Sequence, residues 1–305
     1  MLEKVEDLAK LAKKTAPIRM GVVFAHDPYV IEAVAKSREA GDIFPVLIGN
    51  QEKIKEILRE EALNMPCEII DENDPDQASR IAMDLVNDGE IQVIMKGLLD
   101  TKNLLKAVVN KESGIREKTL LSHVGLVSYP GFNRVLFVTD GAMNIDPGVE
   151  EKIMIIENAV ELAHSLGYDN PAVGIVSAVE KVNPKIQSTV DASQIIKHYE
   201  ENPPKGFVVD GPFAIDNLVS EESVKHKGIV SMVAGHADIL LFPNLDGGNI
   251  FYKTSVFLAG AHSAGIVLGA KVPIVLTSRA DTAMAKYNSI LLAVVNHYGL
   301  RATDN

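Results

Sequence analysis

The chain has 305 residues, which is enough for one large domain or two domains of ordinary size. Hydrophobic residues make up 47% and charged residues 23%, which excludes global disorder. The formal net charge of −11 argues against nonspecific binding to nucleic acid, because such binding needs a basic surface. The single cysteine, Cys67, excludes an intramolecular disulfide and a cysteine-rich metal site. No secretory signal or membrane span is recognisable, so we expect a soluble cytoplasmic protein without membrane partners.

Short apolar runs alternate with segments of helical periodicity. From the N-terminus, the pattern predicts helix 2–14, strand 20–25, helix 28–41, strand 44–48, helix 50–61, strand 68–70, helix 75–87, strand 91–95 and helix 101–111. It continues with strands 122–129 and 134–139, helix 148–166, strand 172–177, helix 188–200, strand 207–209, helical segments within 212–226, strand 238–242, helix 248–259, strand 273–277 and helix 281–298. The turn-rich connection 130–133 predicts that the two middle strands form an antiparallel pair.

Strands that alternate with helices of ten or more residues indicate βαβ units and a mainly parallel sheet. About eleven strands are too many for one sheet in a chain of this length, so we expect an α/β fold of two domains with a cleft between them. We place the first domain at 1–127 plus 284–305 and the second at 128–283. The cleft is the expected position of the active site.

One candidate segment runs from Met95 to Lys106. A strand ends there, Gly97 permits a tight turn, and Thr101 stands near a helix N-terminus, where free N–H groups and the helix dipole attract anions. Thr101 and Asn103 can add side-chain donors, and Lys106 can add positive charge. An ordinary helix cap followed by solvated lysines would give the same spacing.

A second candidate is the end of the apolar strand before Thr277, Ser278 and Arg279. Open α/β sheets place their ligands at the carboxyl ends of strands. The arginine fork is suited to phosphate because it binds two oxygens in a fixed geometry. For Asp281, which follows closely, a helix-capping role is the simpler interpretation.

Two further strand ends carry polar residues. In 242–250, paired glycines and Asn249 follow a strand and allow close approach to a ligand, although a strand-to-helix connection with a capping Asn explains them equally well. In 137–144, turn formation explains Asp140 and Asn144 as well as a site would. The histidines show no metal-binding spacing, so no metal site is predicted.

Together these segments resemble the phosphate acetyltransferase and phosphate butyryltransferase family, and more closely its butyryl branch. The resemblance extends in the family's order from about residue 93 to the last helix, and its strings are MKGLLDTKNLLKAVVNKESGIR, LSHVGLV, VTDGAMNIDP, VDGPFAIDN, VAGHADILLFPNLDGGNIFYK and TSRADT. It implies the reaction acyl-CoA + phosphate ⇌ acyl phosphate + CoA by direct attack in a ternary complex. It also implies two α/β domains of isocitrate/isopropylmalate dehydrogenase-like architecture.

By this resemblance, Ser278 and Arg279 are the catalytic pair that binds and polarises the acyl phosphate. Phosphate contacts are implied for Thr101, Asn103 and Asn249. Lys106 stands where the acetyl enzymes have an arginine that assists CoA. Coenzyme A is a substrate, no tightly bound cofactor is expected, and the enzyme is expected to be a homodimer or a larger homo-oligomer.

The thiol base is where the sequence departs from the family. The acetyltransferases have an acidic residue six positions after the arginine, and this chain has Ala285. His236 and Asp281 are candidates for the base, and a positive field that ionises the thiol without a base is the alternative. The acetyl reaction is the alternative activity, and a metal- and NAD-dependent dehydrogenase or a noncatalytic CoA-binding module are the alternatives from other classes.

Overall fold

The computed structural model describes residues 1–303, with side chains to residue 299. The chain divides into two compact units. The first α/β unit contains Glu6–Leu121 and the chain from Ser263 onward, and the second α/β unit contains Met1–Val5 and Ser122–His262. Both combine a mostly parallel sheet with helices, as the sequence predicts.

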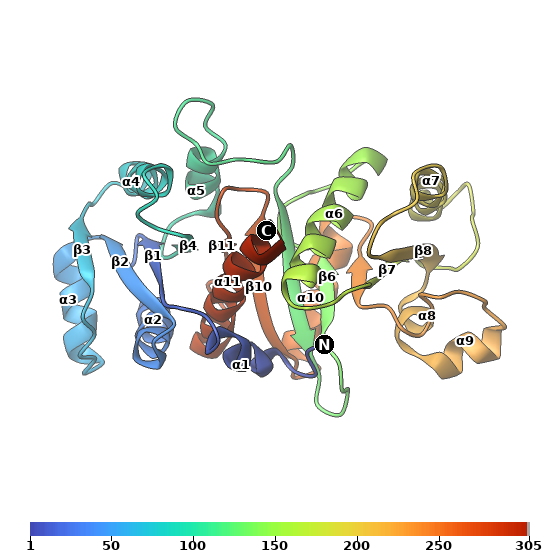
Figure 1. The fold of residues 1–305 in the computed structure, drawn as a ribbon, viewed down its shortest axis with the longest axis horizontal. Helices are drawn as coiled ribbons and strands as arrows, with labels where there is room; N and C mark the ends of the chain where they lie inside the picture. The colour runs from blue at the N-terminus through green and yellow to red at the C-terminus, as the bar shows by residue number, and fades with distance from the viewer. Residues whose placement is uncertain (304–305) are drawn as a thin grey trace. The chain divides into compact units, whose positions relative to one another are not determined.

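The sheet of the first α/β unit has the strand order β3-β2-β1-β4-β11-β10 (Figure 1). Its strands are β1 (Ile18–Val23), β2 (Ile43–Gly49), β3 (Glu68–Asp71), β4 (Val93–Lys96), β10 (His262–Leu268) and β11 (Ile274–Val275). β11 pairs in parallel with β4 and antiparallel with β10, and the other pairs are parallel. β1 and β4 are almost entirely buried, which explains why their sequences are apolar runs rather than alternating patterns.

Helices flank this sheet: α1 (Leu8–Ala12), α2 (Pro28–Ala40), α3 (Gln51–Glu60), α4 (Pro75–Asn87), α5 (Thr101–Val108) and α11 (Ala283–Thr303). α2 packs against α11, and α4 packs against α5. The predicted helix starts are confirmed, because the side chains of Asp27, Asn50 and Asp74 each accept a hydrogen bond from the first turn of the helix that follows. Gly41 ends α2 in the left-handed conformation that glycine favours.

The sheet of the second α/β unit has the order β5-β6-β9-β7-β8. Its strands are β5 (Ser122–Ser128), β6 (Leu136–Thr139), β7 (Ala172–Val176), β8 (Val208–Phe213) and β9 (Ile239–Leu241). Its helices are α6 (Val149–Ser165), α7 (Gln187–Glu201), α8 (Ile215–Val219), α9 (Glu221–Lys227) and α10 (Leu245–Phe257). The predicted antiparallel pairing of β5 with β6 is confirmed, and the remaining pairs are parallel.

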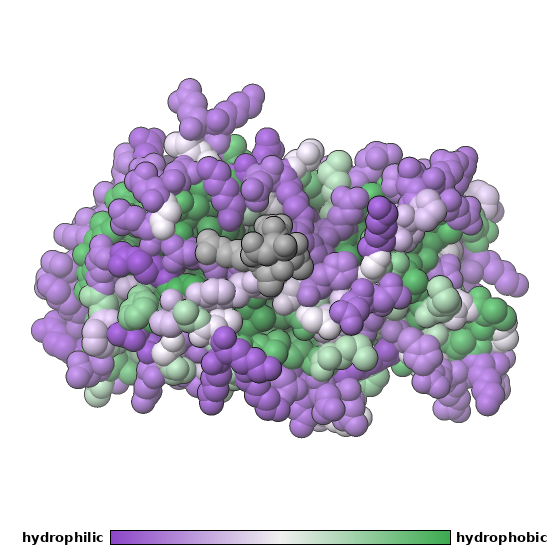
Figure 2. All heavy atoms as spheres, in the orientation of Figure 1, coloured by the Kyte–Doolittle hydropathy of each residue, from purple (hydrophilic) through white to green (hydrophobic). Residues whose placement is uncertain are grey.

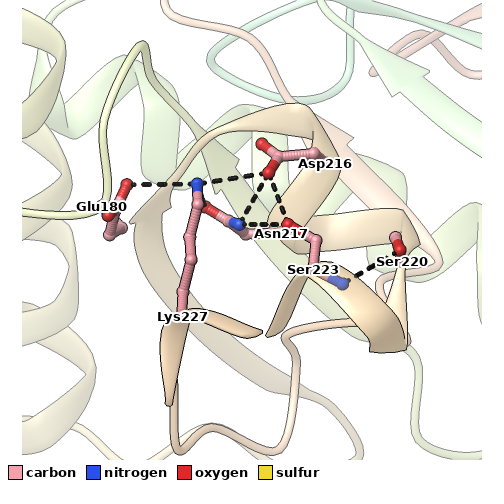
Figure 3. Close-up of polar contacts among 6 residues, drawn as sticks. All are labelled: Glu180, Asp216, Asn217, Ser220, Ser223 and Lys227. Atoms are coloured by element: carbon pink, nitrogen blue, oxygen red, sulfur yellow. Dashed lines mark hydrogen bonds and ion pairs between the residues drawn. The ribbon is translucent and has the colours of Figure 1, made fainter. Parts of the chain in front are cut away.

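A polar cluster joins α8 to α9 in this unit (Figure 3). Asp216 accepts hydrogen bonds from the Ser223 hydroxyl at 2.5 Å and from the Asn217 amide at 3.0 Å. The Lys227 ammonium lies 3.2 Å from Asp216 and 3.7 Å from Glu180. The hydrogen bond from Ser223 and the charge of Lys227 lower the pKa of Asp216 below its usual range. The string VDGPFAIDN therefore carries a structural clamp at its Asp216-Asn217 end.

Three sequence-based expectations differ from the structure. The strand β10 was not predicted from the sequence. Helix α10 begins at Leu245 rather than at residue 248, because Asn244 caps it and the two glycines lie in its first turn. The chain returns to the first α/β unit at residue 263, earlier than the predicted return at 284, because β10 and β11 join the sheet of that unit.

Hydrophilic residues cover most of the face shown in Figure 2, in keeping with the charged composition of the chain. Most of the large apolar side chains on the strands are buried. None of the helices among residues 1–303 is both long enough and apolar enough to cross a membrane.

Candidate active site

Three strands of the first α/β unit bring their following loops to one edge of the sheet. β1, β4 and β11 are parallel, so residues 24–27, 97–100 and 276–282 all leave the carboxyl edge. The chain passes from β1 outward to β3 and returns to the other side of β1 at β4. Open α/β sheets bind ligands in the crevice at such a point, so this edge is the candidate site of the first unit.

The loops after β1 and β4 are in direct contact. The Gly97 amide donates to the Val23 carbonyl and the Leu98 amide to the Phe24 carbonyl, each at 2.8 Å. A Cβ atom at Gly97 would lie 2.3 Å from the Phe24 carbonyl oxygen. Glycine is therefore required at this position by close backbone approach, in agreement with the tight turn that the sequence predicts.

A compact turn presents Ser278 and Arg279 after β11. The Asp281 carboxylate is buried and accepts a 2.7 Å hydrogen bond from the Ser278 amide. The Ser278 hydroxyl accepts a longer bond of 3.3 Å from the Ala280 amide, so its own proton remains available to a ligand. Asp281 thus holds the turn from its inner side and does not cap the helix as expected, because α11 begins at Ala283 and the Thr282 hydroxyl accepts from the Ala285 amide at 3.2 Å.

Arg279 extends from this turn toward the loop after β4. Its Nη2 donates to Asp100 Oδ1 at 2.9 Å, and the side chains of Arg279 and Asp100 are 64% and 76% exposed. Asp100 stands at the N-cap position of α5, yet its carboxylate makes no cap hydrogen bond. The ion pair brings the start of α5, and hence Thr101, beside the Ser278–Arg279 turn.

The other predicted residues of α5 differ in their surroundings. Thr101 is half-buried in the first turn of the helix. Asn103 donates its side-chain amide to Asp76 of α4 at 2.7 Å. Lys106 is exposed further along the helix. Thr101 and Lys106 therefore belong to the same unit as Arg279, whereas the predicted domain bounds place Arg279 in the second domain, 128–283.

Two buried lysines lie beneath these loops, and sequence reasoning missed both. Lys96 ends β4 and Lys286 lies in the first turn of α11, and they are 5% and 2% exposed. Burial is the main reason that the pKa of each lysine is lowered. The only sequence signal is a lysine inside an otherwise apolar stretch, IMK and MAKYNSILL, where burial of the aliphatic stem is expected.

His26 is a further polar residue at this edge. Burial and the charge of Lys53 lower the pKa of His26, so its ring is neutral near pH 7. Its Nδ1 is buried and has no hydrogen-bond partner. The sequence showed His26 only as a histidine near a strand end.

The second α/β unit carries Asn249 and Asp140 at the carboxyl edge of its own sheet. Asn249 donates its side-chain amide to the Gly141 carbonyl at 3.0 Å, which ties α10 to the loop after β6. The buried Asp140 accepts from the amides of His123, Ala142 and Met143 and from the Asn144 side chain. The turn-forming interpretation of Asp140 and Asn144 agrees with these contacts.

His236 lies at the opposite end of β9 from Asn249. It is 60% exposed, its Nδ1 is 3.7 Å from Glu221, and it lines an open pocket of about 710 Å³ with Arg134 and Asp238. Since β9 separates the two positions, one compact site in this unit does not contain both His236 and Asn249. Among residues 1–303, no group of three His, Cys, Asp or Glu side chains is placed to hold a metal ion.

Comparison with known proteins defines the class. Residues 72–294 match the family described as "Phosphate acetyl/butaryl transferase". The chain is 40% identical over 296 residues to a phosphate butyryltransferase of Clostridium beijerinckii, covering 97% of this chain and 98% of that protein. It is 41% identical over 294 residues to a phosphate acetyltransferase of Thermotoga maritima, covering 96% and 99%.

Solved structures agree with this result. A branched-chain phosphotransacylase from Enterococcus faecalis V583 superposes with a TM-score of 0.84 at 32% identity, over 92% of this chain and 99% of that one. A 4-hydroxythreonine-4-phosphate dehydrogenase from Klebsiella pneumoniae shares the fold alone, with a TM-score of 0.54 at 16% identity, over 92% of this chain and 100% of that one.

The fold and the sequence matches define an acyltransferase built on a dehydrogenase-like α/β architecture. The chain belongs to the phosphate acetyl/butyryl transferase family.

Proposed function

We propose that the chain catalyses acyl-CoA + phosphate ⇌ acyl phosphate + CoA, and that it prefers butyryl or branched short acyl chains. Family membership supports the reaction, and the likeness to a butyryltransferase and to a branched-chain phosphotransacylase supports the preference. The observation that carries the proposal is the Ser278–Arg279 turn at the carboxyl edge, held from inside by Asp281. Acetyl transfer is the alternative, since an acetyltransferase is equally similar in sequence.

Each site residue has a proposed role. Arg279 binds the phosphate oxygens through its fork, and the Ser278 hydroxyl donates to the acyl oxygen as negative charge develops on it. Thr101 and Asn103 supply phosphate contacts at the start of α5, and Asn249 is proposed as a further contact. Lys106 binds a charged part of CoA away from the reacting atoms.

The reaction needs no covalent enzyme intermediate. In one direction, the CoA sulfur attacks the acyl carbon, the bond from that carbon to the phosphate oxygen breaks, and the thiol proton ends on the released phosphate. We propose direct attack with acyl-CoA and phosphate bound together and without a tightly bound cofactor. We further propose that the enzyme works in the cytoplasm, where CoA is available, as a homodimer or larger homo-oligomer.

A thiol-release assay tests the proposal. Acetyl-, butyryl- and isobutyryl-CoA are compared at saturating phosphate, and the released CoA is followed by the colour that its thiol develops with a thiol reagent. We expect release that depends on phosphate, with the highest kcat/KM for butyryl- or isobutyryl-CoA. A highest value for acetyl-CoA would establish the acetyl alternative. Absence of release with all three substrates would reject the reaction, and an NADH absorbance assay with a divalent metal would then test the dehydrogenase alternative.

A further inference from the structure

The two buried lysines beneath the site are linked to its loops in the same way. Lys286 Nζ donates to the carbonyls of Ser278 and Asp281, each at 2.9 Å. Lys96 Nζ donates to the carbonyls of Gly97 and Leu99, each at 3.1 Å. One lysine thus holds the turn that presents Ser278 and Arg279, and the other holds the loop that leads to Asp100 and Thr101.

Burial of these two ammonium groups lowers the stability of the fold. Burial of an ammonium group disfavours its charged form, and the lowered pKa values of Lys96 and Lys286 express that cost. Among residues 1–299, Lys152 is also nearly fully buried, and its ammonium is paired with Asp191 at 2.5 Å. Lys96 and Lys286 have no carboxylate within ion-pair distance and bond to carbonyl oxygens instead.

The charges around the two ammonium groups come from three elements. The positive charges of Arg279 and Lys286 act on Lys96, while Asp27 from the β1–α2 connection and Asp100 act in the opposite sense. Asp281 and Asp27 act on Lys286. Three positive charges, those of Lys96, Lys286 and Arg279, thus lie at the carboxyl edge together with the carboxylates of Asp27, Asp100 and Asp281. Asp100 is paired with the exposed Arg279, and the two ammonium groups lie below the surface, where solvent screens their charge little.

We propose that Lys96 and Lys286 are positioning residues that hold the two site loops by their carbonyls, and that their combined charge favours the thiolate of CoA at the Ser278–Arg279 turn. The proposal rests on the proposed function. It accounts for Ala285, which stands where the acetyltransferases have their acidic residue, because a thiol in a positive field loses its proton to water without a protein base. The thiolate then attacks the acyl carbon, the carbon–oxygen bond to phosphate breaks, and the released phosphate takes up a proton from solvent.

The test is the pH dependence of kcat at saturating CoA with butyryl phosphate as the acyl donor, because kcat reports groups that ionise in the enzyme–substrate complex. In the unmodified enzyme, the acidic limb is expected to report ionisation of the bound thiol. We expect Lys286→Met and Lys96→Met to move this limb to higher pH by about one unit, the lower end of the effect of a nearby opposite charge. Lys286→Arg keeps the charge, so its limb is expected to stay within about 0.3 unit of that of the unmodified enzyme.

Lys152→Met is the matched control, because it removes a buried lysine from the second α/β unit. It is expected to lower the melting temperature without moving the limb. Circular dichroism confirms that each variant is folded, and Lys286→Arg provides a readout if a methionine variant does not fold. If the acidic limb of both methionine variants stays at the pH of the unmodified enzyme and only the rate falls, the proposed effect of the two charges on the thiol is wrong. The two lysines would then act only by holding the loops. An unmodified enzyme that releases no thiol from any acyl-CoA would instead reject the proposed function, so the two failures are distinguishable.

Discussion

Arg279 and Asp100 form an ion pair at the surface of the first α/β unit, and both side chains are mostly exposed. An exposed pair of this kind contributes about 0–1 kcal/mol. A phosphate dianion, which offers the guanidinium a bidentate contact, can therefore take the place of the Asp100 carboxylate at little cost. The pair directs the Arg279 guanidinium at the start of α5, where we propose that phosphate binds.

Replacement of Arg279 by alanine is expected to lower kcat by two or more orders of magnitude with the fold intact. The lost contact is electrostatic and strengthens in the transition state, and such contacts contribute about 3–4 kcal/mol. Steady-state kinetics with butyryl-CoA and phosphate measures the change, and the melting temperature controls for folding. Activity above about a tenth of the unmodified rate would remove Arg279 from the catalytic machinery.

Asp100→Asn is expected to lower the KM for phosphate about two- to fivefold, because an exposed ion pair that competes with phosphate is weak. The value of kcat should change little, since Asp100 competes for the guanidinium and takes no part in the transition state. The measurement is initial rate against phosphate concentration at fixed butyryl-CoA. A large fall in kcat at unchanged KM would mean instead that Asp100 takes part in the chemistry.

At the residue scale, the sequence predicts which residues follow the end of a strand, but not which side chains are buried beneath those residues. The place of Ser278 and Arg279 after an apolar strand was enough to select them, because parallel strands deliver their carboxyl ends to one edge. Lys96 and Lys286 were not selected, since their acceptors are backbone carbonyls, which every residue possesses. Only the fold shows which carbonyls meet which ammonium group.

At the scale of whole elements, helix α10 packs closely against the loop after β6 because Gly248 lies at the contact. A Cβ atom at Gly248 would lie 2.5 Å from the Asp140 carbonyl oxygen, whereas one at Gly247 would lie 3.3 Å from the Asn244 side chain. Gly248→Ala is therefore expected to lower the free energy of unfolding by about 1–3 kcal/mol, as overpacking does. Gly247→Ala is the matched control with a smaller effect, and urea denaturation compares the two. Equal changes in the free energy of unfolding of the two variants would show that the close packing at Gly248 does not determine the loss of stability.

The α8–α9 clamp predicts an acid-sensitive contribution to stability. The pKa of Asp216 is lowered in the folded protein, chiefly by the Ser223 hydroxyl, so its contribution is present above the unfolded carboxyl's pKa of about 3.9. That contribution is lost as the pH falls from there through the folded pKa. Between pH 6 and about pH 3, the melting temperature of Asp216→Asn is expected to fall less than that of the unmodified protein. Asp169→Asn, at an exposed site outside the clamp, should keep the original fall.

Elements with local signals were predicted well, and elements defined by distant partners were not. Asp27-Pro28 and Asp74-Pro75 start helices because a cap is a contact within three residues. β10 was missed although its sequence, HSAGIVL, ends in an apolar run that resembles the glycine-containing run of β1. Its strand character comes from pairing with β11.

At the scale of the whole molecule, the cleft between two domains stays a prediction. If both units bind substrate, hydrogen exchange in the presence of CoA and phosphate should slow in residues 97–101 and 277–282 and also in 140–144 and 244–249. Mass spectrometry of peptides from these segments makes the comparison, with the α8–α9 clamp as a region expected not to change. Slowing confined to the first α/β unit would contradict a role for Asn249.

The predicted domain boundaries show where sequence reasoning lacks information at this scale. Two domains of α/β type follow from the number and order of the elements. The residue at which the chain returns to its first sheet depends on pairing across long sequence separations, such as β11 with β4. No local residue pattern encodes that partner, so the return was placed at 284 rather than 263.

The parallel pairing of β11 with β4 also sets the order in which a ribosome can complete the site. Synthesis proceeds from the N-terminus, so Lys96, Asp100 and Thr101 emerge long before Ser278, Arg279 and Lys286. Until residues 263–303 are made, the first α/β unit lacks β10, β11 and α11, and the loop after β4 lacks the Ser278–Arg279 turn. A shorter nascent chain therefore holds only half of the proposed phosphate site, and we expect it to be inactive until that turn has been made.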